Sequence, residues 1–139
     1  MGKWPSDFVA AFSAHDIDGV LSYCTDDIFY EEVVADGVVA HGRQELRARV
    51  QGIFDAFPDI KLELISHFPS GEHDCVEWIS SGTHKADSAG LPATGKCFSY
   101  REVVVAELRN GKISRISLYC DMLTFMRQLG MLPPSPQQQ

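Results

Sequence analysis

The stretch FSYREVVVAELRNGKISRISLYCD, residues 98–121, decides the fold. Its first half is rich in β-branched and aromatic residues, which favour extended strands. The Asn110-Gly111 pair in the middle indicates a tight turn, because both residues readily adopt positive φ angles there. The sequence therefore predicts two long antiparallel strands joined by a two-residue hairpin turn.

Other segments supply further strands and the helices that cover them. Residues 60–68 and 75–84 are predicted as strands, and residues 29–42 as two short strands joined at Ala35-Asp36-Gly37. Helical spacing of apolar residues predicts helices at residues 6–15, 16–27 and 43–57, the last ended by Pro58. This order predicts an α+β fold: a cone-shaped, curved antiparallel sheet packed against the N-terminal helices. The open mouth of such a cone is a natural small-molecule pocket.

The composition excludes several classes of partner. The 139 residues are 45% hydrophobic and 22% charged, with a net charge of −7. The acidic residues are scattered and no basic patch is present, so no nucleic-acid partner is expected. No apolar run is long enough to span a bilayer and the N-terminus lacks a signal-peptide core, so we expect a cytoplasmic protein without membrane contact. Residues 1–132 are expected to form a single domain, followed by a disordered tail at 133–139.

The cysteines and histidines do not indicate a metal centre. The four cysteines, at positions 24, 75, 97 and 120, include no CxxC pair and are expected to stay reduced. The five histidines lack the HxH or HxxxH spacing that is typical of metal ligands. We therefore predict no metal site.

Five short stretches are similar, in the same order, to the SnoaL-like polyketide cyclases of the NTF2-like superfamily. They are AFPDIKLEL (56–64), WISSGTH (78–84), GLPATGK (90–96), NGKISR (110–115) and CDMLTFMRQLG (120–130). The resemblance implies the cone-shaped fold and ring closure by intramolecular aldol condensation without a cofactor. It also implies that Asp121, just before the final short helix, is the general acid/base. Because family members usually associate through the open sheet face, it implies a homo-oligomer, a dimer or a tetramer.

Residues 7–33, DFVAAFSAHDIDGVLSYCTDDIFYEEV, also resemble the opening of the ketosteroid isomerases, which share this fold. This resemblance places the isomerases' general base at Glu32. Their two oxyanion-hole donors correspond to Phe8 and to a position near Val104, where the side chains are apolar. Because the dienolate oxygen in those enzymes needs two hydrogen-bond donors, a steroid isomerase with that oxyanion hole is not expected.

Strand alternation predicts which side chains share the cavity with Asp121. On the last strand, Tyr119 and Asp121 are expected to face the cavity, while Leu118 and Cys120 face away. The other expected cavity residues are Phe8, Phe12, Tyr30, Glu32, Trp78, His84, Tyr100 and Glu102. Aromatic walls suit a flat, small hydrophobic or aromatic substrate, and two or three carboxyl groups would face it.

The two catalytic candidates, Asp121 and Glu32, each have a structural alternative. Asp121 can act as a helix N-cap that accepts a backbone N–H from Leu123 or Thr124. Glu32 can lie at a solvated strand end. In the catalytic alternative, two carboxyl groups in one cone raise each other's pKa, which keeps one of them protonated.

The substrate-binding candidates have alternatives as well. Glu102 can form an ordinary ion pair with Arg101 or Arg115. His84 is the best histidine candidate for a donor to a substrate oxygen, although a histidine at a strand end is more often at the surface. Trp78 and Phe12 pack either the core or the pocket wall.

The leading hypothesis is a cofactor-free cyclase or isomerase of a polyketide-like or other secondary metabolite, with Asp121 as acid/base. A dehydratase or double-bond isomerase that uses Glu32 with Asp121 is the second. The third is a non-catalytic binding or dimerisation module, in which both carboxyl groups point to solvent and side chains fill the cone. The enzyme hypotheses instead require an aromatic-lined cavity with both carboxyl groups inside.

Overall fold

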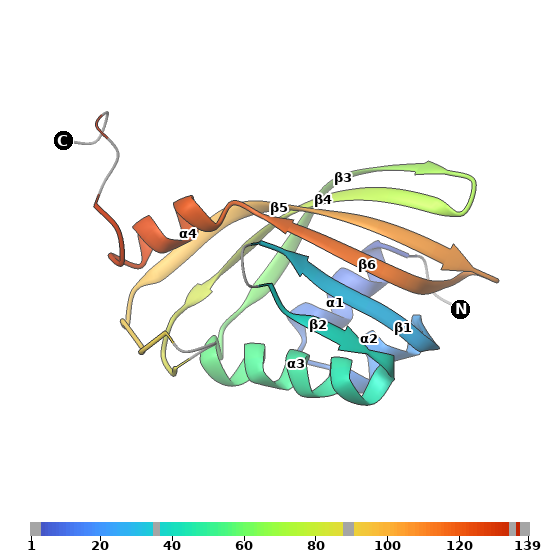
Figure 1. The fold of residues 1–139 in the computed structure, drawn as a ribbon, viewed down its shortest axis with the longest axis horizontal. Coiled ribbons are helices and arrows are strands. Elements are labelled where there is room, and N and C mark those ends of the chain that lie inside the picture. Colours follow the sequence, from blue (N-terminus) through green and yellow to red (C-terminus); the bar gives the residue numbers. More distant parts are fainter. Residues whose placement is uncertain (1–3, 35–36, 88–90, 134–135, 137–139) are drawn as a thin grey trace.

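The computed structural model describes residues 4–34, 37–87, 91–133 and 136, which form one curved sheet and the helices packed against it (Figure 1). The strands are β1 (Cys24–Val33), β2 (Val39–His41), β3 (Lys61–Ser70), β4 (His73–Thr83), β5 (Cys97–Arg109) and β6 (Lys112–Cys120). The helices are α1 (Ser6–Ser13), α2 (Ile17–Ser22), α3 (Gly42–Ala56) and α4 (Met122–Gln128). Among the described residues, no helix is both long and apolar enough to cross a membrane. Most of the expected tail at 133–139 lies outside the described residues.

The predicted α+β class is confirmed, and the sheet has the order β2-β1-β6-β5-β4-β3. Four of its neighbouring pairs are antiparallel. The pairing of β1 with β6 is parallel, which differs from the expected antiparallel sheet. The predicted helix at 16–27 is shorter than expected, because the chain leaves α2 after Ser22 and enters β1 at Cys24.

The turn between β5 and β6 is the two-residue turn that the sequence predicts. Asn110 and Gly111 have φ angles of 53° and 78°, in the left-handed region. Of the other predicted hairpin turn, Ala35-Asp36-Gly37, only Gly37 belongs to the described residues. The segment between β4 and β5 is described except for residues 88–90.

A β-bulge in β6 lies four residues beyond the start of that turn. Leu108 pairs with Ile113, but the next pair along the ladder is Glu107 with Arg115. Ser114 is therefore an extra residue in β6, and its hydroxyl donates to the Glu107 carbonyl oxygen at 3.2 Å. Because side chains alternate between the two faces of a strand, this insertion exchanges the faces of the rest of β6.

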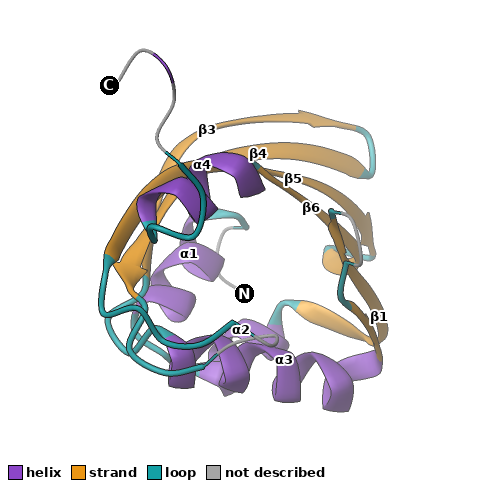
Figure 2. Cartoon of the chain, turned by 60° about the vertical axis from the view of Figure 1, so that its left-hand side comes forward, coloured by secondary structure: helices purple, strands orange, loops and turns teal. Residues whose placement is uncertain are grey.

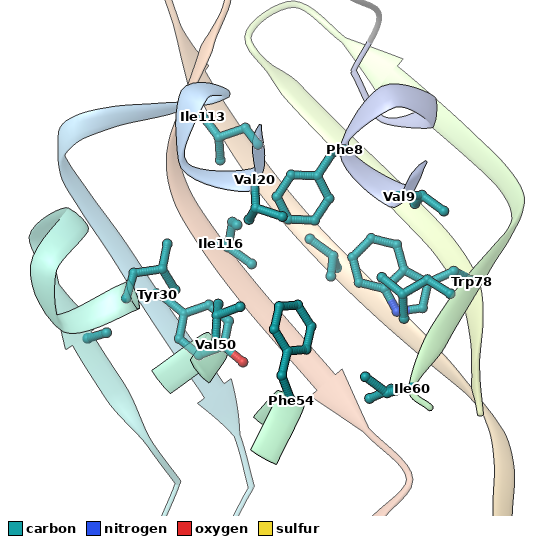
Figure 3. Packing of buried hydrophobic residues seen from close by; sticks show 14 of the residues in the cluster. Phe8, Val9, Val20, Tyr30, Val50, Phe54, Ile60, Trp78, Ile113 and Ile116 are labelled. Carbon is teal, nitrogen blue, oxygen red and sulfur yellow. The ribbon is translucent and has the colours of Figure 1, made fainter. Parts of the chain in front are cut away.

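The helices cover the concave side of the sheet. Leu46, Val50 and Phe54 repeat every four residues along α3 and are buried, so that one face of this helix packs inward. Figure 2 shows the sheet curling around α1 and α3, and α4 packs against β5. The buried side chains of Phe8 and Trp78 point into the space between helices and sheet in Figure 3.

Candidate active site

The space between the concave face of the sheet and the helices holds a cavity of about 370 Å³. This volume is in the range of small-molecule sites. Its walls are rich in aromatic side chains: Phe8, Phe12, Tyr30, Phe57, Trp78, Phe98, Tyr100 and Phe125. Among the described residues that line it, the charged side chains are Glu32, Arg49 and Glu102. The described part of the chain contains no group of three or more His, Cys, Asp or Glu residues placed to hold a metal ion.

Glu102 on β5 is buried in this wall, with 7% of its surface exposed. Its Oε1 accepts a hydrogen bond from Trp78 Nε1 at 3.0 Å. Its Oε2 accepts from the Tyr100 hydroxyl at 2.9 Å and from the Cys120 thiol at 3.2 Å. Burial raises the pKa of Glu102 above its ordinary value; the three hydrogen bonds oppose that shift and the nearby charge of Glu32 adds to it. Glu102 is therefore a buried carboxyl group that keeps its proton to higher pH than an ordinary glutamate does.

Glu32 on β1 faces the same cavity but has a cation beside it. Its two oxygens accept hydrogen bonds from Nε and a terminal nitrogen of Arg49, at 2.6 and 2.8 Å. The Tyr30 hydroxyl donates to Oε2 at 2.7 Å. A Cβ on Gly37 would collide with the carbonyl oxygen of Glu32, so the chain returning to β2 can close over this residue only with glycine there. Arg49 and Tyr30 thus hold Glu32 in one position.

The two cavity carboxyl groups approach from strands on either side of β6. Glu32 pairs with Leu118, and Glu102 pairs with Cys120. With neighbouring strands about 4.8 Å apart, the backbones of β1 and β5 are about 10 Å apart. Leu118 and Cys120 both line the cavity between them. One bound molecule can therefore contact a buried carboxyl group with a raised pKa and a charge-compensated one at the same time.

His84 follows β4 and is completely buried in the cavity wall. Its backbone N–H donates to the Lys96 carbonyl oxygen at 2.9 Å, which ties it to the start of β5. The ring packs on Phe57 with centroids 5.3 Å apart, and Nδ1 lies 3.3 Å from Thr94 Oγ1. Nε2 is buried and has no hydrogen-bond partner among the described residues. The alternative of a surface histidine at this strand end is therefore wrong.

Asp121 lies outside the cavity, so its expected orientation is wrong. It is the N-cap of α4 and is exposed to solvent. Its oxygens accept from the Thr124 backbone N–H at 3.0 Å and from the Thr124 hydroxyl at 2.6 Å. These hydrogen bonds lower the pKa of Asp121 below its ordinary value. The N-cap alternative is confirmed, and an exposed carboxylate of this kind lacks the buried surroundings that favour proton transfer near neutral pH.

The bulge at Ser114 is the physical reason for this difference. A regular ladder continued from the two-residue turn would pair Glu102 with Tyr119 and would put both on one face. The inserted Ser114 instead pairs Glu102 with Cys120. Tyr119 is consequently 48% exposed and does not line the cavity, contrary to expectation.

The remaining predicted cavity residues do line the cavity, and this placement is confirmed for Phe8, Phe12, Tyr30, Glu32, Trp78, His84, Tyr100 and Glu102. Glu102 does not form the ion pair that was its alternative. Arg101 pairs with Glu77 at 3.5 Å instead, and Arg115 pairs with Glu31 at 3.0 Å.

Sequence reasoning missed three polar residues that line the cavity, Arg49, Ser80 and Cys120. Arg49 carries a visible signal, because it lies three residues after Leu46 and four before Ile53, on the face of α3 that lines the cavity. Cys120 could not be assigned without the bulge, since alternation alone places it on the outer face.

Comparison with known proteins agrees with this fold. The family model of the SnoaL-like polyketide cyclases matches residues 6–129. No curated protein shows significant similarity to the chain.

Three solved structures with the same fold are each less than 25% identical to the chain, and their similarity shows the fold alone. AclR from Streptomyces galilaeus, a proposed hydroxylase, is 23% identical with a TM-score of 0.79, over 96% of this chain and 86% of AclR. IdmH from Streptomyces antibioticus, a proposed polyketide cyclase, is 23% identical with a TM-score of 0.74, over 92% of this chain and 99% of IdmH. A Catenulispora acidiphila protein with a ketosteroid isomerase-like fold is 15% identical with a TM-score of 0.79, over 93% and 95% of the two chains.

Proposed function

Because the chain belongs to the SnoaL-like polyketide cyclase family, we propose that it closes a ring in a polyketide-like carbonyl compound by acid/base catalysis without a cofactor. The observation that carries the proposal is Glu102, a buried carboxyl group with a raised pKa in the wall of an aromatic cavity. Solvated carboxyl groups lose their proton well below neutral pH. Burial raises the pKa of a carboxyl group and so moves it toward neutral pH.

An aldol ring closure removes one proton and returns one. A base takes a proton from the carbon beside a carbonyl, and the enolate attacks a second carbonyl carbon to form the C–C bond. The new alkoxide then takes a proton from an acid. A single carboxyl group can perform both transfers in turn, because the proton taken from carbon is returned to oxygen. Glu102 suits this exchange, since Trp78, Tyr100 and Cys120 stabilise its ionised form while burial stabilises its protonated form.

Glu32 supports this chemistry as the second carboxyl group of the cavity. Its negative charge opposes ionisation of Glu102. Its hydrogen bonds from Arg49 and Tyr30 leave lone pairs that can accept a hydrogen bond from an enol or hydroxyl group of the substrate. We assign proton transfer to Glu102 and positioning of the substrate to Glu32.

Proton transfer can be measured before the natural substrate is known. β-Naphthylacetone is a flat ketone whose CH2 group between ring and carbonyl has acidic protons. In D2O, NMR should show that the protein accelerates exchange of these protons for deuterium. Glu102→Gln should abolish the acceleration, and Asp121→Asn is the control variant that should retain it. Acceleration that survives in Glu102→Gln would contradict the assignment.

A double-bond isomerase is the second candidate, favoured by the presence of two carboxyl groups in one cavity. In that reaction the proton leaves one carbon and returns to another carbon of the same enolate. The two candidates differ in the product formed from a β,γ-unsaturated naphthyl ketone, since only an isomerase moves the alkene into conjugation with the carbonyl.

A further inference from the structure

We propose that His84 forms a second binding subsite, which donates a hydrogen bond to an oxygen substituent on the far ring of a neutral, fused-ring substrate. This inference deepens the proposed function and rests on it, because it concerns the same cavity. It assigns one end of the substrate to the carboxyl groups and the other end to the imidazole.

The first observation is the unpaired nitrogen. His84 is fully buried in the cavity wall, and its Nε2 has no partner among the described residues. A buried polar atom without a partner is unfavourable, and native proteins rarely keep one without a functional reason. A ligand oxygen that reaches Nε2 would remove this penalty.

The second observation concerns the tautomer of the His84 ring, that is, which of its two nitrogens donates. Thr94 Oγ1 accepts a hydrogen bond from the Lys96 backbone N–H at 3.3 Å and lies 3.3 Å from His84 Nδ1. With Lys96 as its donor, the Thr94 hydroxyl can give its own proton to Nδ1. A neutral imidazole that accepts at Nδ1 carries its proton on Nε2. We assign this tautomer to His84, so that the subsite donates and selects an acceptor such as a carbonyl or ether oxygen.

The third observation is the aromatic path between the two ends. From His84, ring contacts lead through Phe57, Phe98 and Phe125 to Tyr100, with centroids 5.1–5.5 Å apart. Tyr100 then donates to Glu102. Trp78 is the partner of Glu102 in the ladder and lies six residues before His84. Six residues of extended strand span about 20 Å, and the curvature of the strand and the length of the side chains reduce the distance between the two functional groups. A flat molecule of more than one ring fits such a path.

The charges of the cavity favour a neutral substrate. The negative charge of Glu32 is matched by Arg49, and burial keeps Glu102 toward its protonated form. Among the described lining residues no further cation is present to pair with an anionic substrate. An unpaired charge in this apolar surrounding would be strongly disfavoured.

The test compares two ketones that differ at one position. β-Naphthylacetone lacks an oxygen on its far ring, and its methoxy derivative carries an ether oxygen there that can only accept. Isothermal titration calorimetry should show that the protein binds the methoxy ketone about tenfold more tightly, the effect of one buried hydrogen bond. His84→Phe should bind both ketones equally, at the affinity of the parent compound. His84→Gln should restore part of the preference, because its amide N–H can reach a similar position.

Thr94→Val provides a variant outside the cavity lining, in case His84→Phe does not fold. It removes the donor to Nδ1 and should reduce the preference for the methoxy ketone. A preference that is absent in the original protein, or that remains unchanged in all three variants, would overturn the subsite. If a derivative with a carboxylate on the far ring bound more tightly than β-naphthylacetone itself, the proposal of a neutral substrate would be overturned.

These outcomes separate the subsite from the proposed reaction. Loss of the methoxy preference in His84→Phe, together with deuterium exchange that survives in Glu102→Gln, would retain the subsite and reject the proton-transfer assignment. The reverse pair of results would reject only the subsite.

Discussion

Glu102 and Asp121 carry the same functional group in opposite surroundings. Glu102 points into the cavity, where burial raises its pKa. Asp121 follows the neighbouring strand, lies in solvent and caps α4, and its hydrogen bonds to Thr124 lower its pKa. Burial therefore makes one carboxyl group easier to protonate, which suits proton exchange, while the other stays ionised more readily and holds a helix end.

The difference comes from a single inserted residue. Ser114 shifts the register of β6 so that Cys120, and not Tyr119, is paired with Glu102. Asp121, the residue after Cys120, is exposed and does not line the cavity. A β-bulge near one end of a strand can thus decide which carboxyl group becomes available for chemistry at the other end.

The largest expected effect is on proton transfer. Glu102→Gln should reduce the exchange rate of β-naphthylacetone by about 10²–10⁴-fold, the usual contribution of a general acid/base. Asp121→Asn should leave the rate near that of the unmodified protein, because asparagine also caps helices. The reverse result, a large loss only in Asp121→Asn, would return the acid/base role to Asp121.

The next effect is on stability and compares two arginines of α3. Arg49→Met would leave Glu32 partly buried without its cation, and we expect a loss of about 3 kcal/mol, the lower end for a broken buried pair. Arg47→Met is the matched control, since its ion pair with Asp18 is exposed and should contribute about 0–1 kcal/mol. Urea unfolding measures both. Adding Glu32→Gln to Arg49→Met should recover part of the loss, and equal losses from the two arginine variants would contradict a buried role for Glu32.

The pH dependence of stability should have opposite signs for the two carboxyl groups. The raised pKa of Glu102 gives a contribution that is complete below the ordinary glutamate pKa of 4.5 and is lost as pH rises through the folded value. The stability of Glu102→Gln relative to the unmodified protein should therefore increase as pH rises from 4.5 through the pKa of Glu102 in the folded protein. The lowered pKa of Asp121 gives a contribution that is present above the ordinary aspartate pKa of 3.8 and is lost as pH falls. Asp121→Asn should be less stable than the unmodified protein above pH 3.8, and this difference should disappear on acidification. If the stabilities of the two variants changed with pH in the same direction, the opposite signs would be refuted.

The sequence was sufficient for most of the elements and for eight of the residues that line the cavity. Apolar periodicity locates α3, and the Asn110-Gly111 turn joins β5 to β6 at the expected residues. The parallel pairing of β1 with β6 was not predictable in this way, because no local pattern records which distant strands become neighbours.

The polar contacts of the site were less predictable, since they depend on that three-dimensional register. No feature of the sequence around Ser114 marks it as a bulge residue. Its insertion nevertheless determines whether Tyr119 or Cys120 faces the cavity. Arg49 was not predicted either, although its helical spacing indicates the face of α3 that lines the cavity. Its pairing with Glu32 joins residues on α3 and β1, which only the folded chain brings together.

The smallest expected effect is at the cap of α4. Asp121→Ala removes the acceptor for the Thr124 backbone N–H and should reduce the free energy of unfolding by about 1 kcal/mol. Asp121→Asn should cost less, because its amide oxygen can accept the same hydrogen bond. Since Met122, Phe125 and Met126 of α4 line the cavity, fraying of this helix in Asp121→Ala should weaken binding of β-naphthylacetone without removing deuterium exchange. Exchange that is lost at saturating ketone would show that Asp121 does more than hold the helix.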